Sequence, residues 1–127
     1  MKSTIFLLLI LLPGRNEAQT VKSFLDAIVK SENYTLNKYL SNEVICNLEG
    51  SEINGKQNVL MKLTDFVSTN GIKSSKLIHE AVTKGKESFM GIGSLISDKS
   101  KYRVYLTFGS GENKEMVKDI KIEKDLF

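Results

Sequence analysis

The fold class of this chain is decided by one stretch, Lys101-Tyr-Arg-Val-Tyr-Leu-Thr-Phe108. Its side chains alternate between an apolar and a more polar set: Tyr102, Val104, Leu106 and Phe108 against Arg103, Tyr105 and Thr107. Period-two alternation among aromatic and β-branched residues predicts a β-strand. A glycine-containing loop, residues 109–113, precedes a second alternating run, residues 114–124, in which Met116, Ile120 and Ile122 share one face. The two runs predict an antiparallel hairpin.

Two further strands are predicted upstream, over residues 75–83 and 87–97, with turns at 84–86 and 98–100. The run 87–97 is apolar on both parities, a pattern typical of a strand covered on both faces. Gly91 and Gly93 fall on the same face as Phe89. Two positions without side chains on one face predict either a bend or another element packed close to the strand.

Helical periodicity precedes the strands. Amphipathic helices are predicted over residues 20–30, 34–40 and 56–68, with a short strand over 43–49 and a loop over 50–55. The third helix carries an apolar stripe: Val59, Leu60, Leu63, Phe66 and Val67. Helices placed before a run of strands predict an α+β fold, in which a curved antiparallel sheet packs against the N-terminal helices. A sheet bent around a helix encloses a cavity at its mouth.

Composition narrows the function classes. The chain has 127 residues and a net charge of +3, with basic and acidic residues interspersed. No basic stripe with stacking aromatics is present, so nucleic-acid binding is not expected. The lone cysteine, Cys46, lies in an apolar run and is interpreted as a small buried hydrophobe. No metal-ligand spacing, phosphate-binding glycine loop or serine-nucleophile motif occurs, so we expect no metal and no cofactor.

The first residues have the layout of a secretory signal peptide. Lys2 precedes an apolar run, residues 5–12, which ends at Pro13-Gly14. We expect cleavage after Ala18, which leaves 19–127 as a single α+β domain, secreted or periplasmic and without a membrane segment. The alternative interpretations are a buried N-terminal helix and an uncleaved anchor.

The order of elements resembles the nuclear transport factor 2-like superfamily, also called the cystatin-like α+β roll. Residues 24–44 are similar to its opening helix, short helix and first strand, and residues 55–66 to its third helix. Within it, the chain is more similar to a family of small exported bacterial proteins of uncharacterised function. Four pieces carry that likeness: Leu63-Thr-Asp-Phe66, Lys76-Leu-Ile-His79, Gly91-Ile-Gly93 and Tyr102-Arg-Val-Tyr105.

This resemblance covers about residues 20–123 and implies the fold. It does not imply an activity, because the superfamily includes isomerases, dehydratases, hydrolases, transport adaptors and plain binding or dimerisation modules.

Candidate site residues follow from the predicted faces. Tyr39, Phe66, Phe89 and Met90 are expected to line a small apolar pocket between sheet and helices. His79 is expected to share a face of its strand with Leu77 and Ala81, and it is either a general base or a partly buried, hydrogen-bonded strand residue. Arg103 and Tyr105 share a face of their strand, which is either a small anionic-ligand site or the polar side of the sheet that faces solvent or a second copy.

The sequence therefore favours an exported binding or dimerisation module over an enzyme. The occupant would be a small apolar or anionic ligand in the pocket, or a second copy against the outer sheet face. The alternative is a small hydrolase or isomerase that uses His79 with a nearby carboxylate. That alternative requires His79 to line a cavity within hydrogen-bond reach of the carboxylate.

Overall fold

The structure is a computed structural model, which describes residues 17–83, 88–109 and 116–125. The elements, in chain order, are α2 (Glu17–Val29), α3 (Asn33–Tyr39), β1 (Leu40–Leu48), β2 (Ser51–Asn54), α4 (Lys56–Asn70), β3 (Ser74–Thr83), β4 (Ser88–Ile96), β5 (Lys101–Phe108) and β6 (Val117–Lys124). Helices precede a run of strands, as predicted.

The strands form one six-stranded sheet in the order β2-β1-β6-β5-β4-β3. The last four strands pair antiparallel with their neighbours in sequence, so the predicted meander is confirmed. The expectation of a wholly antiparallel sheet is wrong at one place, because β1 runs parallel to β6. β1 and β6 are distant in sequence, and a parallel pair needs a long connection of the kind that α4 and the four strands β2 to β5 provide here.

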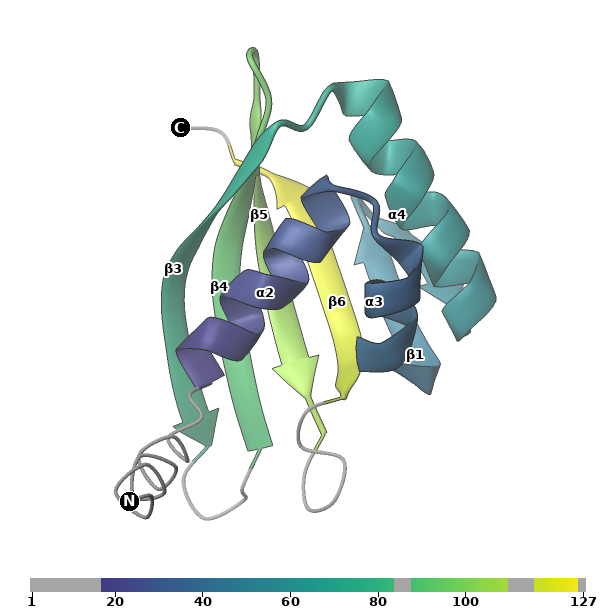
Figure 1. The fold of residues 1–127 in the computed structure, drawn as a ribbon, viewed down its shortest axis with the longest axis vertical. Coiled ribbons are helices and arrows are strands. Elements are labelled where there is room, and N and C mark those ends of the chain that lie inside the picture. The colour runs from purple at the N-terminus through teal and green to yellow at the C-terminus, as the bar shows by residue number, and fades with distance from the viewer. Residues whose placement is uncertain (1–16, 84–87, 110–115, 126–127) are drawn as a thin grey trace, which may run out of the picture.

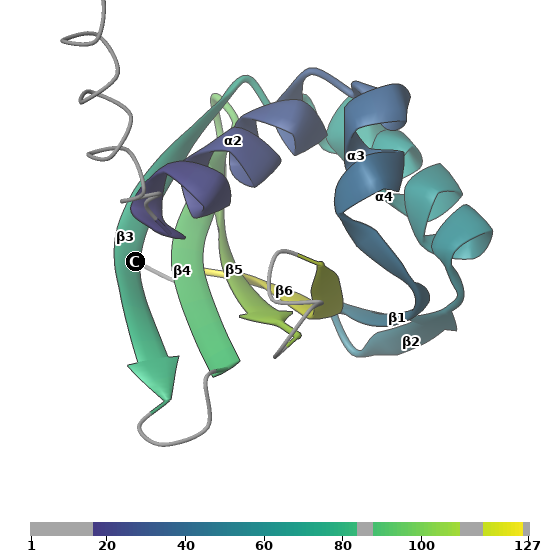
Figure 2. The same ribbon diagram turned by 60° about the horizontal axis from the view of Figure 1, so that its bottom comes forward.

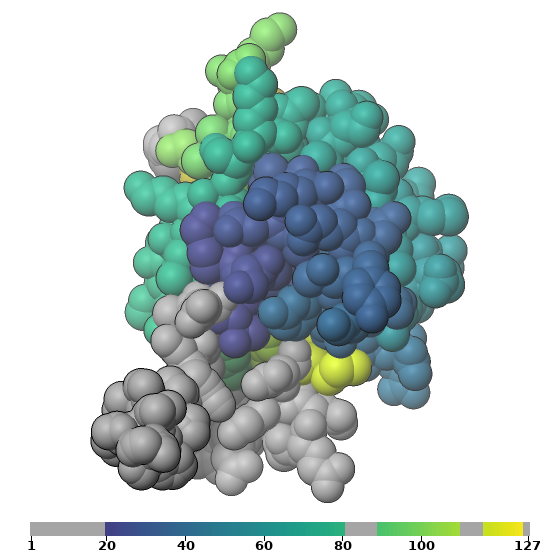
Figure 3. All heavy atoms as spheres, in the orientation of Figure 1, coloured from purple at the N-terminus to yellow at the C-terminus, as the bar shows by residue number. Residues whose placement is uncertain are grey.

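The sheet curves, and the helices cover its concave side (Figures 1 and 2). In the space-filling view α2 and α3 lie across the middle of this side, with α4 beside them (Figure 3). The core lies between the layers and includes Phe24 and Leu25 of α2, Leu63 and Phe66 of α4, and Phe108 of β5. The predicted α+β architecture with a curved sheet packed on the helices is confirmed.

The two glycines of β4 explain how closely α2 approaches the sheet. A Cβ atom on Gly91 would lie 2.5 Å from Cγ2 of Val21, and one on Gly93 would lie 2.8 Å from the backbone oxygen of Lys76, besides a clash with Leu25. Real Cβ atoms do not approach other atoms this closely. The prediction that these glycines admit a close neighbour is confirmed, and the neighbour is α2.

The segment predicted as a loop, residues 50–55, contains a strand. Leu48 faces Ser51 across a two-residue turn, in which Glu49 has φ 49° and Gly50 has φ 93°. Positive φ at both central residues is the pattern of a type I′ hairpin. The sequence signal for such a turn is normally Asn-Gly or Asp-Gly, and the glutamate at its first position weakens that signal.

A bulge shifts the register at the start of β6. Thr107 faces Asp119 and Phe108 faces Val117, so Lys118 is the extra residue. Ile120 and Ile122 are buried as predicted, but the buried residue at the start of the strand is Val117. The prediction that Met116 continues their face is wrong, because a bulge exchanges the two faces beyond it.

Several predictions concern residues outside the described ranges. The predicted signal peptide lies outside them except for its last two residues, as do the turn at 84–86 and most of the loop at 109–113. Among the residues that are described, no helix has the length and apolar character needed to cross a membrane.

Candidate functional site

The convex side of the sheet faces away from α2 and is not covered by the described helices (Figures 1 and 2). We call it the outer face and define it by the residues that alternate with the core positions. These are Lys76 and His79 on β3, Met90, Ile92, Ser94 and Ile96 on β4, Lys101, Arg103, Tyr105 and Thr107 on β5, Asp119, Lys121 and Glu123 on β6, Ile45 and Asn47 on β1, and Glu52 and Asn54 on β2.

The seven predicted site residues do not meet in one place. Tyr39, Phe66 and Phe89 lie on the inner side in separate ring contacts, with Phe24, Tyr102 and Phe108 respectively. Phe66 and Phe89 are buried in the core, and Tyr39 packs against it. His79, Met90, Arg103 and Tyr105 belong to the outer face. Met90 and Phe89 are successive residues of β4 and point to opposite faces of the sheet, so they cannot line one pocket.

His79 reaches the outer face because of a bulge in β3. Leu77 faces Gly93 and His79 faces Ile92, which leaves Ile78 as the extra residue. The expectation that His79 shares a face with Leu77 is therefore wrong. His79 is exposed, and no described carboxylate forms a hydrogen bond or ion pair with it. This arrangement gives an acid–base mechanism at His79 no support.

Arg103 and Tyr105 lie together at the middle of the outer face. Nη2 of Arg103 donates a hydrogen bond to Oδ2 of Asp125 over 3.1 Å, and this bond raises the pKa of the guanidinium. Nζ of Lys121 lies over the Tyr105 ring, 6.0 Å from its centroid. The guanidinium is thus already paired with a carboxylate, which disfavours a dedicated anion site and favours a mixed, polar contact surface.

β4 presents apolar side chains to the outer face. Met90 is 39% exposed and Ile92 is half-buried. The predicted cover on both faces of β4 is therefore absent in the single described chain, because the helices lie on one side only. The same face also exposes Ile45 on β1, at 39%.

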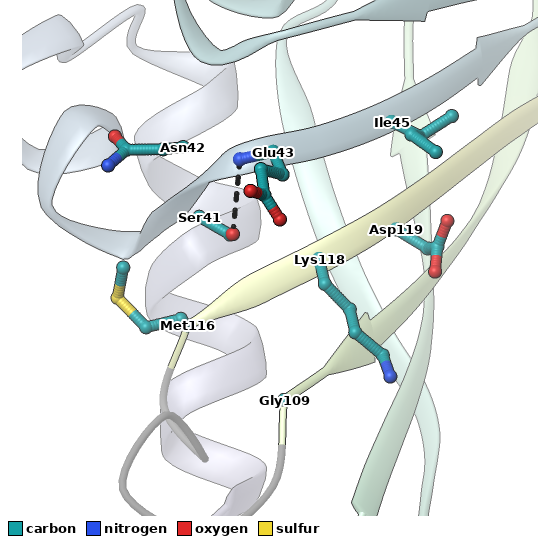
Figure 4. Close-up of a pocket in the computed structure, with 8 residues that line it drawn as sticks. All are labelled: Ser41, Asn42, Glu43, Ile45, Gly109, Met116, Lys118 and Asp119. Carbon is teal, nitrogen blue, oxygen red and sulfur yellow. Dashed lines mark hydrogen bonds between the residues drawn. The ribbon is translucent and has the colours of Figure 1, made fainter.

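A groove opens at one end of this face, where β1 leaves β6 (Figure 4). Leu40 pairs with Val117 and Ile45 with Asp119, so the residues between Leu40 and Ile45 outnumber those opposite them and bulge away. The groove, of about 620 Å³, is lined by Ser41, Asn42, Glu43, Ile45, Gly109, Met116, Lys118 and Asp119.

This groove is polar and continuous with the outer face through Ile45 and Asp119. The backbone N–H of Glu43 donates to Oγ of Ser41 over 3.3 Å, which fixes the bulged segment (Figure 4). Carboxylates and the Lys118 ammonium line it together, and no group of three or more potential metal ligands gathers anywhere in the described ranges. Sequence reasoning missed the groove, because a mismatch between two distant strands leaves no local pattern.

A polar cluster on the concave side ties α2 to β3. Oγ of Ser75 donates to Oδ1 of Asp26 over 2.6 Å, and Nζ of Lys22 donates to the same oxygen over 2.9 Å. The Ser75 hydrogen bond, followed by the contact with Lys22, lowers the pKa of Asp26. Because each member has its partner within the cluster, we interpret it as a structural link between helix and sheet.

Cys46 is inert in this structure. Its side chain has no exposed surface, and burial raises the pKa of the thiol to about 12. A thiol with such a pKa carries almost no thiolate near neutral pH, so it is neither a nucleophile nor a metal ligand. The interpretation of Cys46 as a buried hydrophobe is confirmed.

Comparison with known proteins identifies the relatives. Residues 21–123 match the model of a family described as a domain of unknown function, DUF4783. A DUF4783 family protein from Bacteroides uniformis is 25% identical, with a TM-score of 0.68 over 80% of this chain and 93% of that one. A second, from Bacteroides ovatus, is 22% identical, with a TM-score of 0.70 over 81% and 93%.

More distant structures share the fold alone. A protein of unknown function with a cystatin-like fold from Methylobium petroleophilum is 8% identical, with a TM-score of 0.66 over 84% of this chain and 73% of that one. Another structure, named Rd1NTF2_04 with long sheet, is 8% identical, with a TM-score of 0.71 over 82% of this chain and 96% of that one. The likeness to a nuclear transport factor 2-like, cystatin-like roll is confirmed for the fold. No curated protein matches the chain.

Proposed function

The chain belongs to the DUF4783 family, and on that premise we propose that it is a binding module without catalytic activity, whose outer face packs against a second copy of the same chain. The proposed location is outside the cytoplasm, secreted or periplasmic, and the support for that part is the signal-peptide layout of residues 1–18.

The observation that carries the proposal is the outer side of β4. A strand that is apolar on both faces is normally covered on both, and α2 covers one. Met90 and Ile92 occupy the other side, and Ile78 at the neighbouring bulge is 43% exposed. Apolar side chains gathered on one otherwise polar face mark an interaction surface.

The size of the face fits a stable dimer. The strands are spaced about 4.8 Å apart, and all except the four-residue β2 have eight to ten residues, so the sheet spans roughly 550 Å². Two such faces bury at most about 1,100 Å², close to the roughly 1,000 Å² expected of a biological interface, because two convex faces meet mainly over their central strands. The small-ligand part of the hypothesis has less support, since the seven residues predicted for the site divide between two sides of the sheet.

The test is the oligomeric state of two matched methionine variants. Sedimentation velocity of the unchanged protein should show a dimer at micromolar concentration. Met90→Glu should raise the dimer Kd by about tenfold or more, because a carboxylate is then desolvated in the contact. Met61→Glu is the control, since Met61 is also exposed, at 64%, but lies on α4.

A protein that stays monomeric at every concentration would overturn the proposal. So would an equal effect of both variants, provided that circular dichroism shows both to be folded. Native mass spectrometry of the same samples would also reveal a retained small molecule by its mass.

A further inference from the structure

We infer that the two-fold axis of the proposed dimer runs along the strands, between β5 and β6, so that β5 of one copy lies on β6 of the other. This inference rests on the proposed function and adds the arrangement of the two copies. It follows from how charge and apolar surface are distributed over the outer face.

The two halves of the outer face carry opposite charge. The half formed by β3, β4 and β5 contributes Lys76, Lys101 and Arg103, together with His79. Among the described residues, the one carboxylate that forms an ion pair with this half is Asp125, which pairs with Arg103. The half formed by β6, β1 and β2 contributes Asp119, Glu123 and Glu52. Lys121 is its one cation among the outer-face residues, and Lys118 and Glu43 line the adjoining groove. We call these the basic half and the acidic half.

Residues of the outer face also line up in rows across the strands. The central row passes through every strand of the sheet: His79, Ile92, Tyr105, Lys121, Asn47 and Glu52. The next row includes Met90, Thr107, Asp119 and Ile45. On the other side of the central row lie Lys76, Ser94, Arg103 and Glu123.

Two sheets packed face to face by a two-fold axis have two simple arrangements. A two-fold axis parallel to the strands places each row of one copy over the same row of the other copy. The basic half of each copy then faces the acidic half of its partner. Arg103 then lies opposite the partner's Glu123, and Tyr105 lies opposite the partner's Lys121. Met90 meets the partner's Ile45, which joins the two apolar residues that are each 39% exposed.

A two-fold axis parallel to the central row instead places each strand over the same strand of the partner. Lys121 then lies opposite the partner's Lys121, and Asp119 lies opposite the partner's Glu123. Like charges would face each other across the interface, and such juxtapositions disfavour association. The crossing of twisted sheets, by about 30°, loosens the matches toward the edges but leaves them intact near the axis. Charge and apolar surface therefore favour the same axis.

Cross-linking of cysteine variants distinguishes the two axes. His79 and Glu52 occupy the two ends of the central row, and both are exposed. We would prepare His79→Cys and Glu52→Cys separately, treat each alone and both mixed with a short bifunctional maleimide, and identify the products by mass. Cys46 should stay unmodified in the folded protein, because it is buried and the pKa of its thiol is about 12.

The expected result is a cross-linked product that contains one copy of each variant and forms only in the mixture. Self-cross-linking of His79→Cys would overturn the inference in favour of the other axis. A dimer that sedimentation detects but that neither variant cross-links would also overturn it, while the proposed function would stand. Monomeric protein in sedimentation would instead remove the proposed function itself.

Salt provides a second readout on the unchanged protein. If opposite halves face each other, screening should raise the dimer Kd by about threefold or more between low and high salt. A dimer that tightens with added salt would indicate like charges in contact and would overturn the inference.

Discussion

Neighbouring residues of β5 lie in two different environments. Leu106 has no exposed surface and packs in the core beneath α2, whereas Tyr105, one position earlier, is half-buried on the outer face under the ammonium of Lys121. The same alternation holds along the strand, where Tyr102, Val104 and Phe108 are buried with Leu106.

The difference separates what stabilises this fold from what is available for recognition. The inner face is close-packed and intolerant of changes in volume. The outer face carries charge, hydroxyls and a few apolar side chains whose contacts within the chain are sparse. Substitutions on the two faces should therefore change different measured quantities.

The largest expected effect is on the inner face. Leu106→Ala should lower the free energy of unfolding by about 3 kcal/mol, because it removes buried contacts and leaves a cavity. Tyr105→Ala should lower it by less than about 1 kcal/mol. Urea denaturation at one fixed protein concentration measures both, and equal losses would contradict the division between the faces.

Substitutions of the glycines of β4 test how closely α2 packs against the inner face of the sheet. Gly91→Ala should destabilise by about 2 kcal/mol, since the new methyl group clashes with the buried and stiff Val21. In a Val21→Ala background the same change should cost under about 1 kcal/mol.

Gly93→Ala provides the control for this double-mutant cycle. Its methyl group would lie 2.8 Å from the backbone oxygen of Lys76, so a smaller residue in place of Leu25 should not rescue it. An additive result for Gly91 and Val21 would show that α2 is not held at this distance from the sheet. Full rescue of Gly93→Ala would show instead that the backbone of Lys76 can shift.

The link between α2 and β3 should depend on pH. The pKa of Asp26 is lowered in the folded state, so its contribution is fully present above the unfolded value of about 3.9 and is lost as pH falls through the folded value. The group is 43% exposed, so Asp26→Asn should cost only about 0.5 kcal/mol at pH 7. The difference from the unchanged protein should shrink as pH falls below the unfolded value of Asp26; a difference that stays constant with pH would point to lost packing.

The smallest effect is expected for Lys121 on the outer face. Its contact with Tyr105 has a long separation, 6.0 Å, and lies on the surface. Lys121→Gln should change the free energy of unfolding by less than about 0.5 kcal/mol in the monomer. Thermal denaturation at low protein concentration measures this change, and a loss near that of Leu106→Ala would place Lys121 in the stabilising layer.

Much of the fold could be predicted because its signals are local. The apolar stripe of α4, the alternation of β5 and the paired glycines of β4 each report the environment of one element. The errors arose where two elements interact. The bulges at Ile78 and Lys118 exchange faces, and they moved His79 to the outer face and replaced Met116 with Val117 in the core.

The candidate site was predicted only in part for the same reason. Arg103 and Tyr105 were correctly placed together, because they lie on one uninterrupted strand. The proposed pocket joined residues of opposite parity, Phe89 and Met90, and the sheet separates them. The groove beside Ser41 depends on how β1 departs from β6, which no single segment encodes.

The sequence by itself determined the order of the elements apart from β2, the buried side of β5 and the presence of an apolar outer side on β4. The periodicity of the apolar side chains carries this information, because successive residues of a strand point to opposite faces of the sheet. Only the tertiary structure decided that β1 joins the meander in parallel, where the bulges fall and which charges share the outer face. These features depend on pairings between residues that are distant in the chain.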